Sequence, residues 1–427
     1  MSTGSRELTS IEICAGAGGQ ALGLHRAGFR HLALVEVDPH AAESLRENIR
    51  TRRDWAWERK KCRVLEGDVK KFQPIGHILN PDLDDRTHRE FSDDEALRRL
   101  REEGGAAEKE KYLLAPGRLD LLAGGVPCPP FSVAGKQLGM DDDRDLFPEM
   151  LGLVEELRPR AVMIENVRGL VEPEVKFRYY RNQIKNRLRK AGYVICGWRV
   201  LEAGDFGVPQ LRPRAILVAI REDCYRGFDW PVPQKKIKTV FAALENSMAR
   251  RLGGRESELY QQWEREVKNG TVAPTLVGGS KRHGGADLGP TRAKRAWERL
   301  GVDAMGVAND EDKMVDSDRD LGKIGRGPKL TVAQAAIIQG FPEDWIFSGG
   351  KTARYRQVGN AFPPPVAAAV GEAIKDALAR TGPLHDDPDP GFEPEGDPSD
   401  LDTTIPFQPA FPAFEDDTAD HGGALVR

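Results

Sequence analysis

The chain has 427 residues, of which 39% are hydrophobic and 30% charged, a composition typical of soluble globular proteins. This length is too great for one ordinary hydrophobic core and predicts two domains, one large and one small. No apolar stretch approaches bilayer length, and the polar start MSTGSRELTS argues against a secretory signal.

The net charge of −4 hides an uneven distribution. Residues 383–427 contain twelve acidic residues and one arginine, which leaves 62 basic and 55 acidic residues in 1–382, a net charge of +7. The basic body permits a polyanionic partner without requiring one. The tail, 383–427, is too acidic and proline-rich to bury a core, so we expect it to be disordered.

The five cysteines are scattered and never form a CxxC pair. This argues against a disulfide framework and against a metal site, and it fits a reducing cytoplasm. They are Cys14, Cys62, Cys128, Cys196 and Cys224.

Apolar runs alternate with helical patterns along the chain. The predicted strands lie in 10–19, 31–38, 63–69, 119–125, 160–167, 192–201 and 214–220, and the predicted helices in 20–29, 39–50, 144–157 and 175–190. This alternation predicts an α/β fold with a mostly parallel, doubly wound sheet, whose ligands bind beyond the carboxyl ends of the strands.

The pattern also predicts the domain boundaries. Residues 1–222 form the large domain, interrupted by a charged insert at about 71–117 in which we see no chemistry. Residues 223–327 form a smaller irregular or β-rich domain, because the alternation stops there and glycine becomes frequent. Residues 328–382 return to the large domain and end in an amphipathic helix opened by prolines.

Three successive strand ends carry groups suited to an adenosine-type cofactor. The first runs into the turn Cys14-Ala-Gly-Ala-Gly-Gly, which lets a ligand approach the backbone. The second ends at Glu36, where a carboxylate can accept hydrogen bonds from a ribose diol, and the third at Asp68. Singly, each feature has a structural explanation, glycine packing or a helix cap. The spacing is not GxGxxG, which weakens a nicotinamide interpretation.

A cysteine lies among prolines in Pro127-Cys128-Pro129-Pro130-Phe131-Ser132. A buried cysteine usually behaves as a small apolar residue, which suits Cys62 and Cys196. Prolines on both sides suit a loop that presents Cys128 rather than packs it. Such a thiol becomes a nucleophile where a dipole or cation stabilises its thiolate.

Two further segments place charged groups beside buried strands. Glu165, in Glu165-Asn166-Val167, follows the apolar run AVMI, and burial without a partner would raise the pKa of its carboxyl. Arg212 and Arg214 occupy alternate positions of an extended segment and so point the same way. They could hold an anion or bridge surface carboxylates.

Taken in this order, the motifs resemble those of the DNA (cytosine-5) methyltransferases. EICAGAGGQALGL, ALVEVD and GDV resemble the cofactor motifs, GGVPCPPFSVAGKQ the nucleophile motif, ENVRGL the Glu-Asn-Val motif and FGVPQLRPR the Gln-Arg-Arg motif. KLTVAQAAIIQGFPEDW and YRQVGNAFPPPV resemble the last two. The resemblance covers about 1–222 and 329–375, and eight motifs in order are specific.

The resemblance implies transfer of a methyl group from S-adenosylmethionine to carbon 5 of cytosine in double-stranded DNA. Cys128 would add to carbon 6, Glu165 would engage ring nitrogen 3 and the exocyclic amine, and Arg214, with Arg212, would hold the base and its phosphates. The target base would be flipped out of the duplex. No metal is implied.

The resemblance also implies a cofactor site and a DNA interface. The cofactor residues would be Cys14, Ala15, Gly16, Gly18, Gly19, Glu36, Asp68, Val69, Pro127 and Asn360. The DNA-binding residues would be Ser132, Gln137, Arg168 and Gln210 together with the basic residues of a target-recognition domain, Lys281, Arg282, Arg292, Lys294 and Arg295. Singly, each basic residue could equally belong to a solvated face.

Three positions depart from the family pattern. Most members have Phe where this chain has Cys14, often Asp where it has Glu12, and many have Gln where it has Pro129. We interpret Cys14 as a pocket wall without a catalytic role.

Other functions are compatible with parts of this pattern. An RNA-methylating member of the same family, a catalytically idle DNA-binding module and a nicotinamide oxidoreductase are the alternatives. The favoured interpretation is a monomeric, cytoplasmic, nucleoid-associated enzyme that pairs functionally with a restriction endonuclease and has no membrane or metal partner.

Overall fold

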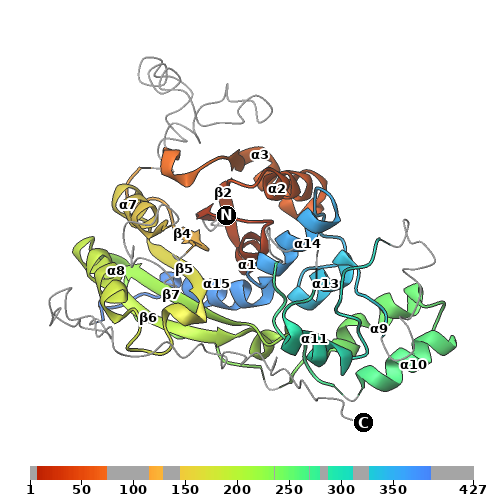
Figure 1. The fold of residues 1–427 in the computed structure, drawn as a ribbon. Helices are drawn as coiled ribbons and strands as arrows, with labels where there is room; N and C mark the ends of the chain where they lie inside the picture. Colours follow the sequence, from red (N-terminus) through yellow and green to blue (C-terminus); the bar gives the residue numbers. More distant parts are fainter. Residues whose placement is uncertain are drawn as a thin grey trace, which may run out of the picture.

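The computed structural model describes seven ranges of the chain (Figure 1), namely 7–74, 115–127, 145–234, 236–268, 270–278, 287–310 and 327–385. Most of the insert at 71–117 and nearly all of the acidic tail therefore lie outside the described residues. No helix within these ranges is both long and apolar enough to cross a bilayer.

A seven-stranded sheet forms the centre of the large domain. Its order is β3-β2-β1-β4-β5-β7-β6, and β7 alone runs antiparallel to its neighbours. The bounds are β1 Leu8–Ile13, β2 Phe29–Glu36, β3 Arg63–Glu66, β4 Leu121–Gly124, β5 Ala161–Val167, β6 Tyr193–Glu202 and β7 Pro213–Arg221. The predicted mostly parallel sheet is confirmed, with its strands where the apolar runs lie.

Helices cover both faces of the sheet, which is why its central strands are apolar on both sides. On β4, Leu121 and Ala123 share a core with the helices α1 and α15, whereas Leu122 shares a core with α7 and α8. Because successive residues of a strand point to opposite faces, the two helix pairs lie on opposite faces. The bounds are α1 Gly19–Ala27, α7 Phe147–Leu157, α8 Arg178–Lys190 and α15 Pro364–Ala379.

Small residues let the last helix pack closely on the first. A β-carbon on Gly23 of α1 would lie 2.4 Å from the Ala367 side chain and 2.5 Å from the Pro364 carbonyl oxygen of α15. A β-carbon on Gly19 would lie 2.2 Å from the Phe362 carbonyl oxygen. This contact brings the C-terminal segment beside the first strand, as the motif order requires.

Local capping determines where helix α2, which follows β2, begins. Helix α2 spans Pro39–Thr51, with Pro39 in its first turn and Asp38 as its N-cap; the Asp38 carboxylate accepts the backbone N–H of His40 at 2.9 Å. The short helix α3 spans Glu58–Lys61.

The segment 223–327 differs from its prediction. Its described part contains the helices α9 Val240–Arg251, α10 Glu258–Val267 and α11 Thr291–Glu298 and no named strand, so the β-rich expectation is wrong for that part. The reason is visible in α10, where Tyr260, Trp263 and Val267 recur at helical spacing and are buried.

These helices share one core with the segment that follows. That core contains residues of α9, α10 and α11, of α2, and of the two helices α13 Val332–Gln339 and α14 Lys351–Asn360. The contacts tie the segment to both ends of the large domain, and Figure 1 shows α9, α11, α13 and α14 gathered on one side of the sheet.

Candidate active site

The predicted site residues of the cofactor and catalytic motifs gather at the carboxyl edge of the sheet. Cys14 follows β1, Glu36 ends β2, Gly125 follows β4 and Glu165 lies near the end of β5. Since β2, β1, β4 and β5 are neighbours and parallel, their ends meet at one edge.

Glu36 holds the glycine turn. Its Oε2 accepts the backbone N–H of Gly16 at 2.7 Å and its Oε1 accepts that of Asp38 at 2.8 Å. Cys14 and Gly16 both have positive φ, 53° and 55°, and no atom lies within 4 Å of the position that a β-carbon on Gly16 would occupy. A carboxylate has about four acceptor sites, so Glu36 retains capacity for a ligand's hydroxyls beside this open space.

The surroundings of Cys14 favour a cation. Burial raises the pKa of its thiol, and the carboxyl groups of Glu36, Glu12, Asp68 and Glu149 raise it further. The raised pKa favours the neutral thiol of Cys14. The same carboxyl groups suit a ligand carrying a sulfonium and an ammonium, so the residues present fit S-adenosylmethionine.

Glu12 is the most enclosed of these acids. It is 1% exposed, and its Oε2 has no hydrogen-bond partner. Burial first, and the Glu36 carboxyl second, raise the pKa of Glu12 well above its usual value.

The other predicted cofactor residues that are described differ in their exposure. Asp68 is exposed and caps a short 3₁₀ turn, its Oδ1 accepting the backbone N–H of Lys70 at 3.0 Å, while Val69 is buried. Asn360, the last residue of α14, is exposed. Trp345 joins this segment to the glycine turn, because its Nε1–H donates to the Ala17 carbonyl at 3.0 Å.

On the catalytic side, Glu165 and Arg214 form an ion pair. Arg214 Nε lies 2.9 Å from Glu165 Oε1, with side chains that are 13% and 14% exposed. Burial raises the pKa of the Glu165 carboxyl, and Arg214 and Arg212 partly oppose that rise. The pair therefore combines a carboxyl whose pKa is raised by burial with a cation 2.9 Å away.

The strand end before Cys128 lies against this pair. A β-carbon on Gly125 would lie 3.0 Å from Glu165 Oε2, and Asn166 Nδ2–H donates to the Val126 carbonyl at 2.8 Å. Pro127 is exposed and is the last residue described before a gap. Cys128, Ser132, Gln137, Lys281 and Arg282 lie outside the described residues.

Gln210 and Arg212 occupy different places from those predicted. Gln210 is fully buried; its Nε2–H donates to Gln339 Oε1 at 2.7 Å, and its Oε1 accepts the Leu276 N–H at 2.8 Å. Every polar atom of its side chain bonds inside the protein, and its DNA contact stays a prediction. Arg212 is 1% exposed and donates to backbone carbonyls, so it has no surface to offer a phosphate.

Apart from the buried Gln210, the predicted DNA-binding residues that are described are exposed or half-buried. Arg168 follows β5 and pairs with Glu172. On α11, Arg292 and Arg295 are exposed, and Lys294 pairs with Asp287 at 2.9 Å.

Three further residues were not among the predicted site residues, although Asn166 lies in the Glu-Asn-Val motif. Asn166 anchors the strand end that leads to Cys128, and Arg299 extends the exposed basic stripe of α11. Val37, next to Glu36, is 67% exposed. An apolar residue directly after a strand-end acid is a usable signal for a ligand-facing wall, since such residues are otherwise buried.

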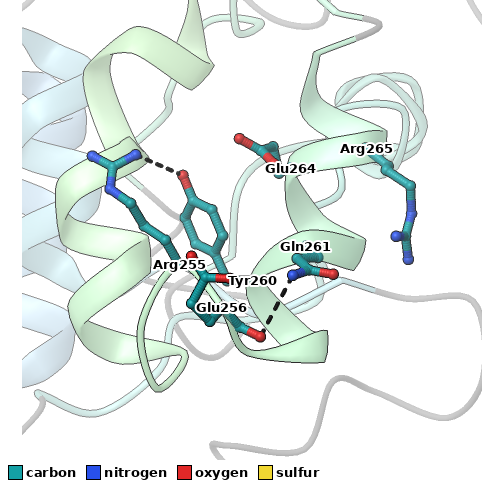
Figure 2. Close-up of a pocket in the computed structure, with 6 residues that line it drawn as sticks. All are labelled: Arg255, Glu256, Tyr260, Gln261, Glu264 and Arg265. Carbon is teal, nitrogen blue, oxygen red and sulfur yellow. Dashed lines mark hydrogen bonds between the residues drawn. The ribbon is translucent and has the colours of Figure 1, made fainter.

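A shallow pocket lies elsewhere, on α10 and the turn before it. Figure 2 shows its lining, in which Arg255 donates to the Tyr260 hydroxyl at 3.4 Å and Glu256, Gln261, Glu264 and Arg265 complete the wall. None of these is a predicted site residue, and acids and bases alternate, so the pocket favours neither sign of charge.

Comparison with known proteins agrees with the motif order. The chain is 47% identical over 378 residues to the type II methyltransferase M.NaeI of Lentzea aerocolonigenes, covering 88% of this chain and 77% of that protein. It is 43% identical over 378 residues to M.NgoMIV of Neisseria gonorrhoeae, covering 88% and 99%.

Solved structures agree on the fold. The Entamoeba histolytica methyltransferase EhMeth aligns with a TM-score of 0.53 at 14% identity, and S. pombe Dnmt2 with 0.51 at 15%, each covering 88% of this chain and all of that chain. The family model of the C-5 cytosine-specific DNA methylases matches residues 8–74 and 101–376. The chain therefore belongs to the C-5 cytosine-specific DNA methylases, enzymes that take their methyl group from S-adenosylmethionine.

Proposed function

We propose that this DNA cytosine-5 methyltransferase acts on a specific site in double-stranded DNA through a covalent adduct between Cys128 and a flipped cytosine. The observation that carries the proposal is the place of the Glu165–Arg214 pair, against the strand end three residues before Cys128. The activity itself follows from family membership.

The chemistry needs a nucleophile because cytosine carbon 5 does not attack a methyl group unaided. The Cys128 thiolate adds to carbon 6, and carbon 5 becomes nucleophilic as the ring takes up the electron pair. S-adenosylmethionine supplies an electrophilic methyl group. Carbon 5 takes this methyl group, and S-adenosylhomocysteine is the leaving group. Transfer of the carbon-5 proton to a base and cleavage of the bond between carbon 6 and the Cys128 sulfur then release 5-methylcytosine and regenerate the thiolate.

Glu165 is suited to stabilise this adduct. As the thiolate adds, negative charge develops on the ring, and a protonated carboxyl at ring nitrogen 3 neutralises it. The raised pKa of Glu165 keeps a proton available, while Arg214 orients the carboxyl through the 2.9 Å ion pair. Because the reacting carbons are enclosed in a stacked duplex, the base must leave the stack.

The exposed face of α11 supports a DNA partner. Arg292, Arg295 and Arg299 recur at helical spacing and are exposed, whereas Trp297 of the same helix is fully buried. We propose that this stripe binds DNA phosphates, which position an enzyme on the duplex. The relatives are named type II methyltransferases, and we propose a protective role beside a restriction endonuclease for this enzyme as well.

Two measurements test the mechanism. Bisulfite sequencing of DNA from cells that express the protein identifies the methylated site. A duplex with 5-fluorocytosine at that site then traps the covalent adduct, because fluorine does not leave as the carbon-5 proton does. Cys128→Ser should abolish the adduct and methyl transfer yet bind S-adenosylmethionine as the wild type does. Turnover at the wild-type rate in Cys128→Ser would remove the proposed mechanism.

The same DNA duplex, compared with RNA, distinguishes the proposed DNA enzyme from an RNA-methylating enzyme. Equal methylation of a transfer-RNA pool and of the duplex would favour the RNA enzyme of this family, which acts on single-stranded or looped bases.

A further inference from the structure

Arg212 connects three distant parts of the chain. Its Nη1–H donates to the Leu276 carbonyl at 2.6 Å, and its Nη2–H donates to the carbonyls of Gly359 at 2.7 Å and Ala361 at 3.1 Å. Leu276 belongs to the segment before the basic stretch 281–295, and Gly359 and Ala361 flank Asn360. The Arg212 guanidinium thus joins the segment before the predicted DNA-binding residues to the segment that contains the predicted cofactor residue Asn360.

The burial of the Arg212 guanidinium needs an explanation. Arg212 is 1% exposed, and no carboxylate among the described residues lies within ion-pair distance of it. Burial lowers the pKa of its guanidinium well below the usual value. A buried charge without a paired charge is expensive, so an apolar residue would be expected here if packing alone mattered.

The carbonyls that it holds determine where Asn360 points. Since the carbonyls of Gly359 and Ala361 both accept from one rigid guanidinium, the backbone around the exposed Asn360 has little freedom. Gly278 lies against the Asn360 side chain, because a β-carbon on Gly278 would lie 2.1 Å from Asn360 Oδ1. A shift of 276–278 therefore moves Asn360.

Gln210 repeats the connection two residues earlier. It accepts the Leu276 N–H and donates to Gln339, whose own amide donates to the Ala361 carbonyl. On the other side of Arg212, Pro213 leads directly to Arg214 and its ion pair with Glu165. Residues 210–214 thus contact Leu276, the backbone next to Asn360, and Glu165.

We propose that Arg212 is a positioning residue that couples target binding to cofactor binding, a role that rests on the proposed function of Asn360 and of the recognition segment. When DNA binds beyond Gly278, the contacts of Leu276 with Arg212 and of Gly278 with Asn360 transmit that binding to the cofactor site. Such coupling is reciprocal, so cofactor tightens DNA binding by the same factor by which DNA tightens cofactor binding.

The experiment measures that factor with S-adenosylhomocysteine, which fills the cofactor site without turnover. Its dissociation constant is determined by calorimetry with and without a duplex carrying the site found by bisulfite sequencing. For the wild type we expect the duplex to tighten binding by about 5-fold or more. Arg212→Lys, which keeps the charge but loses the fork, and Arg212→Met should both reduce the factor to about 1 to 2.

Arg160→Lys is the matched control. Arg160 also ties a strand to the C-terminal helix, donating to Asp120 at 3.0 Å and to the Leu378 carbonyl at 2.9 Å, but at the start of β5, the opposite edge of the sheet. It should lose stability and keep the wild-type factor. Gly278→Ala tests the same contact from the DNA side and should lower the factor even if both Arg212 variants unfold.

The outcomes separate the two proposals. A wild-type factor near 1, or an undiminished factor in folded Arg212→Lys or in Gly278→Ala, overturns the coupling role while methyl transfer by the wild type stands. A wild type that methylates no DNA removes the proposed function instead.

Discussion

Glu165 and Arg214 approach to 2.9 Å across the antiparallel strands β5 and β7. This ion pair depends on the reversed direction of β7. Because β7 is antiparallel to β5, its first residues lie beside the carboxyl end of β5, whereas a parallel strand would begin at the opposite edge of the sheet. The antiparallel strand β7 thus places Arg214 at the same edge of the sheet as Glu36 and Glu165, which lie near the ends of parallel strands.

Glu165→Gln should lower kcat by about 10²–10⁴-fold, because the amide cannot deliver a proton to the ring. Binding of S-adenosylmethionine should be unchanged, since Glu165 faces the base side of the site. Initial rates on the cognate duplex and calorimetry measure the two effects. Glu156→Gln is the control, because burial also raises the pKa of the Glu156 carboxyl but α7 holds it away from the strand ends. A Glu165→Gln rate near that of the control would exclude a proton-transfer role.

Arg214→Met should shift the alkaline limb of the pH–rate profile to higher pH. Arg214 opposes the rise in the pKa of Glu165, so its loss raises that pKa further. The protonated acid is the active form, and activity is lost as pH rises through its pKa. Arg214→Lys keeps the cation and should leave the limb near its wild-type position. A limb that stays in place in Arg214→Met would assign it to another group.

Three glycine substitutions should separate packing from ligand access. Gly23→Ala should destabilise the protein by about 1–3 kcal/mol, because its β-carbon overlaps α15. Gly16→Ala meets no atom but has positive φ, so it should lose about 1 kcal/mol and weaken S-adenosylmethionine binding. Gly152→Ala, in α7 with no atom closer than 4.0 Å, should gain about 0.5–1 kcal/mol. Denaturant unfolding and calorimetry check each value; unaltered cofactor affinity in Gly16→Ala would contradict the assigned pocket.

His31 should make stability fall in mild acid. It is fully buried, its ring nitrogens contact the Ser10 hydroxyl and the Ala21 carbonyl at 2.9 Å, and burial lowers its pKa to about 4. Below about pH 6.5 the unfolded chain binds a proton that the folded one refuses, so stability is complete above that pH and decreases towards pH 4.

The slope from this group is up to about 1.4 kcal/mol per pH unit. Glu58, His25 and Arg30 also act on His31 and modify the slope. His31→Gln should flatten the decline in urea titrations at pH 4.5–6.5, and His40→Gln, at an exposed position, should not. An equal decline in wild type and His31→Gln would contradict the buried neutral ring.

Replacing Arg292 and Arg295 of α11 and its C-cap Arg299 by Gln should weaken DNA binding and flatten its salt dependence. Each lost phosphate contact reduces the slope of log K against log salt by about 1. Fluorescence anisotropy from 50 to 200 mM salt measures the slope, with Arg265→Gln on α10 as the control. A triple variant with the wild-type slope would place the DNA elsewhere.

The sequence alone was sufficient for the sheet and for the acids at its edge. Apolar runs broken by helical periods predicted the strands, and the positions of Glu36 and Glu165 at the ends of β2 and β5 followed directly. These features are local, because strand period and strand end are properties of a few consecutive residues.

The tertiary structure decided what Gln210 and Arg212 do. Their polar side chains, read along the chain, indicate an exposed surface. Burial becomes possible because the carbonyls of residues 276, 359 and 361 accept from Arg212, while Gln210 accepts the Leu276 N–H and donates to Gln339. It also decided that α9 and α10 are helices, since their apolar faces are buried in a core that they share with α11, α13 and α14. Hydrogen bonds and burial that join residues far apart in the chain are set by packing, and no local pattern records them.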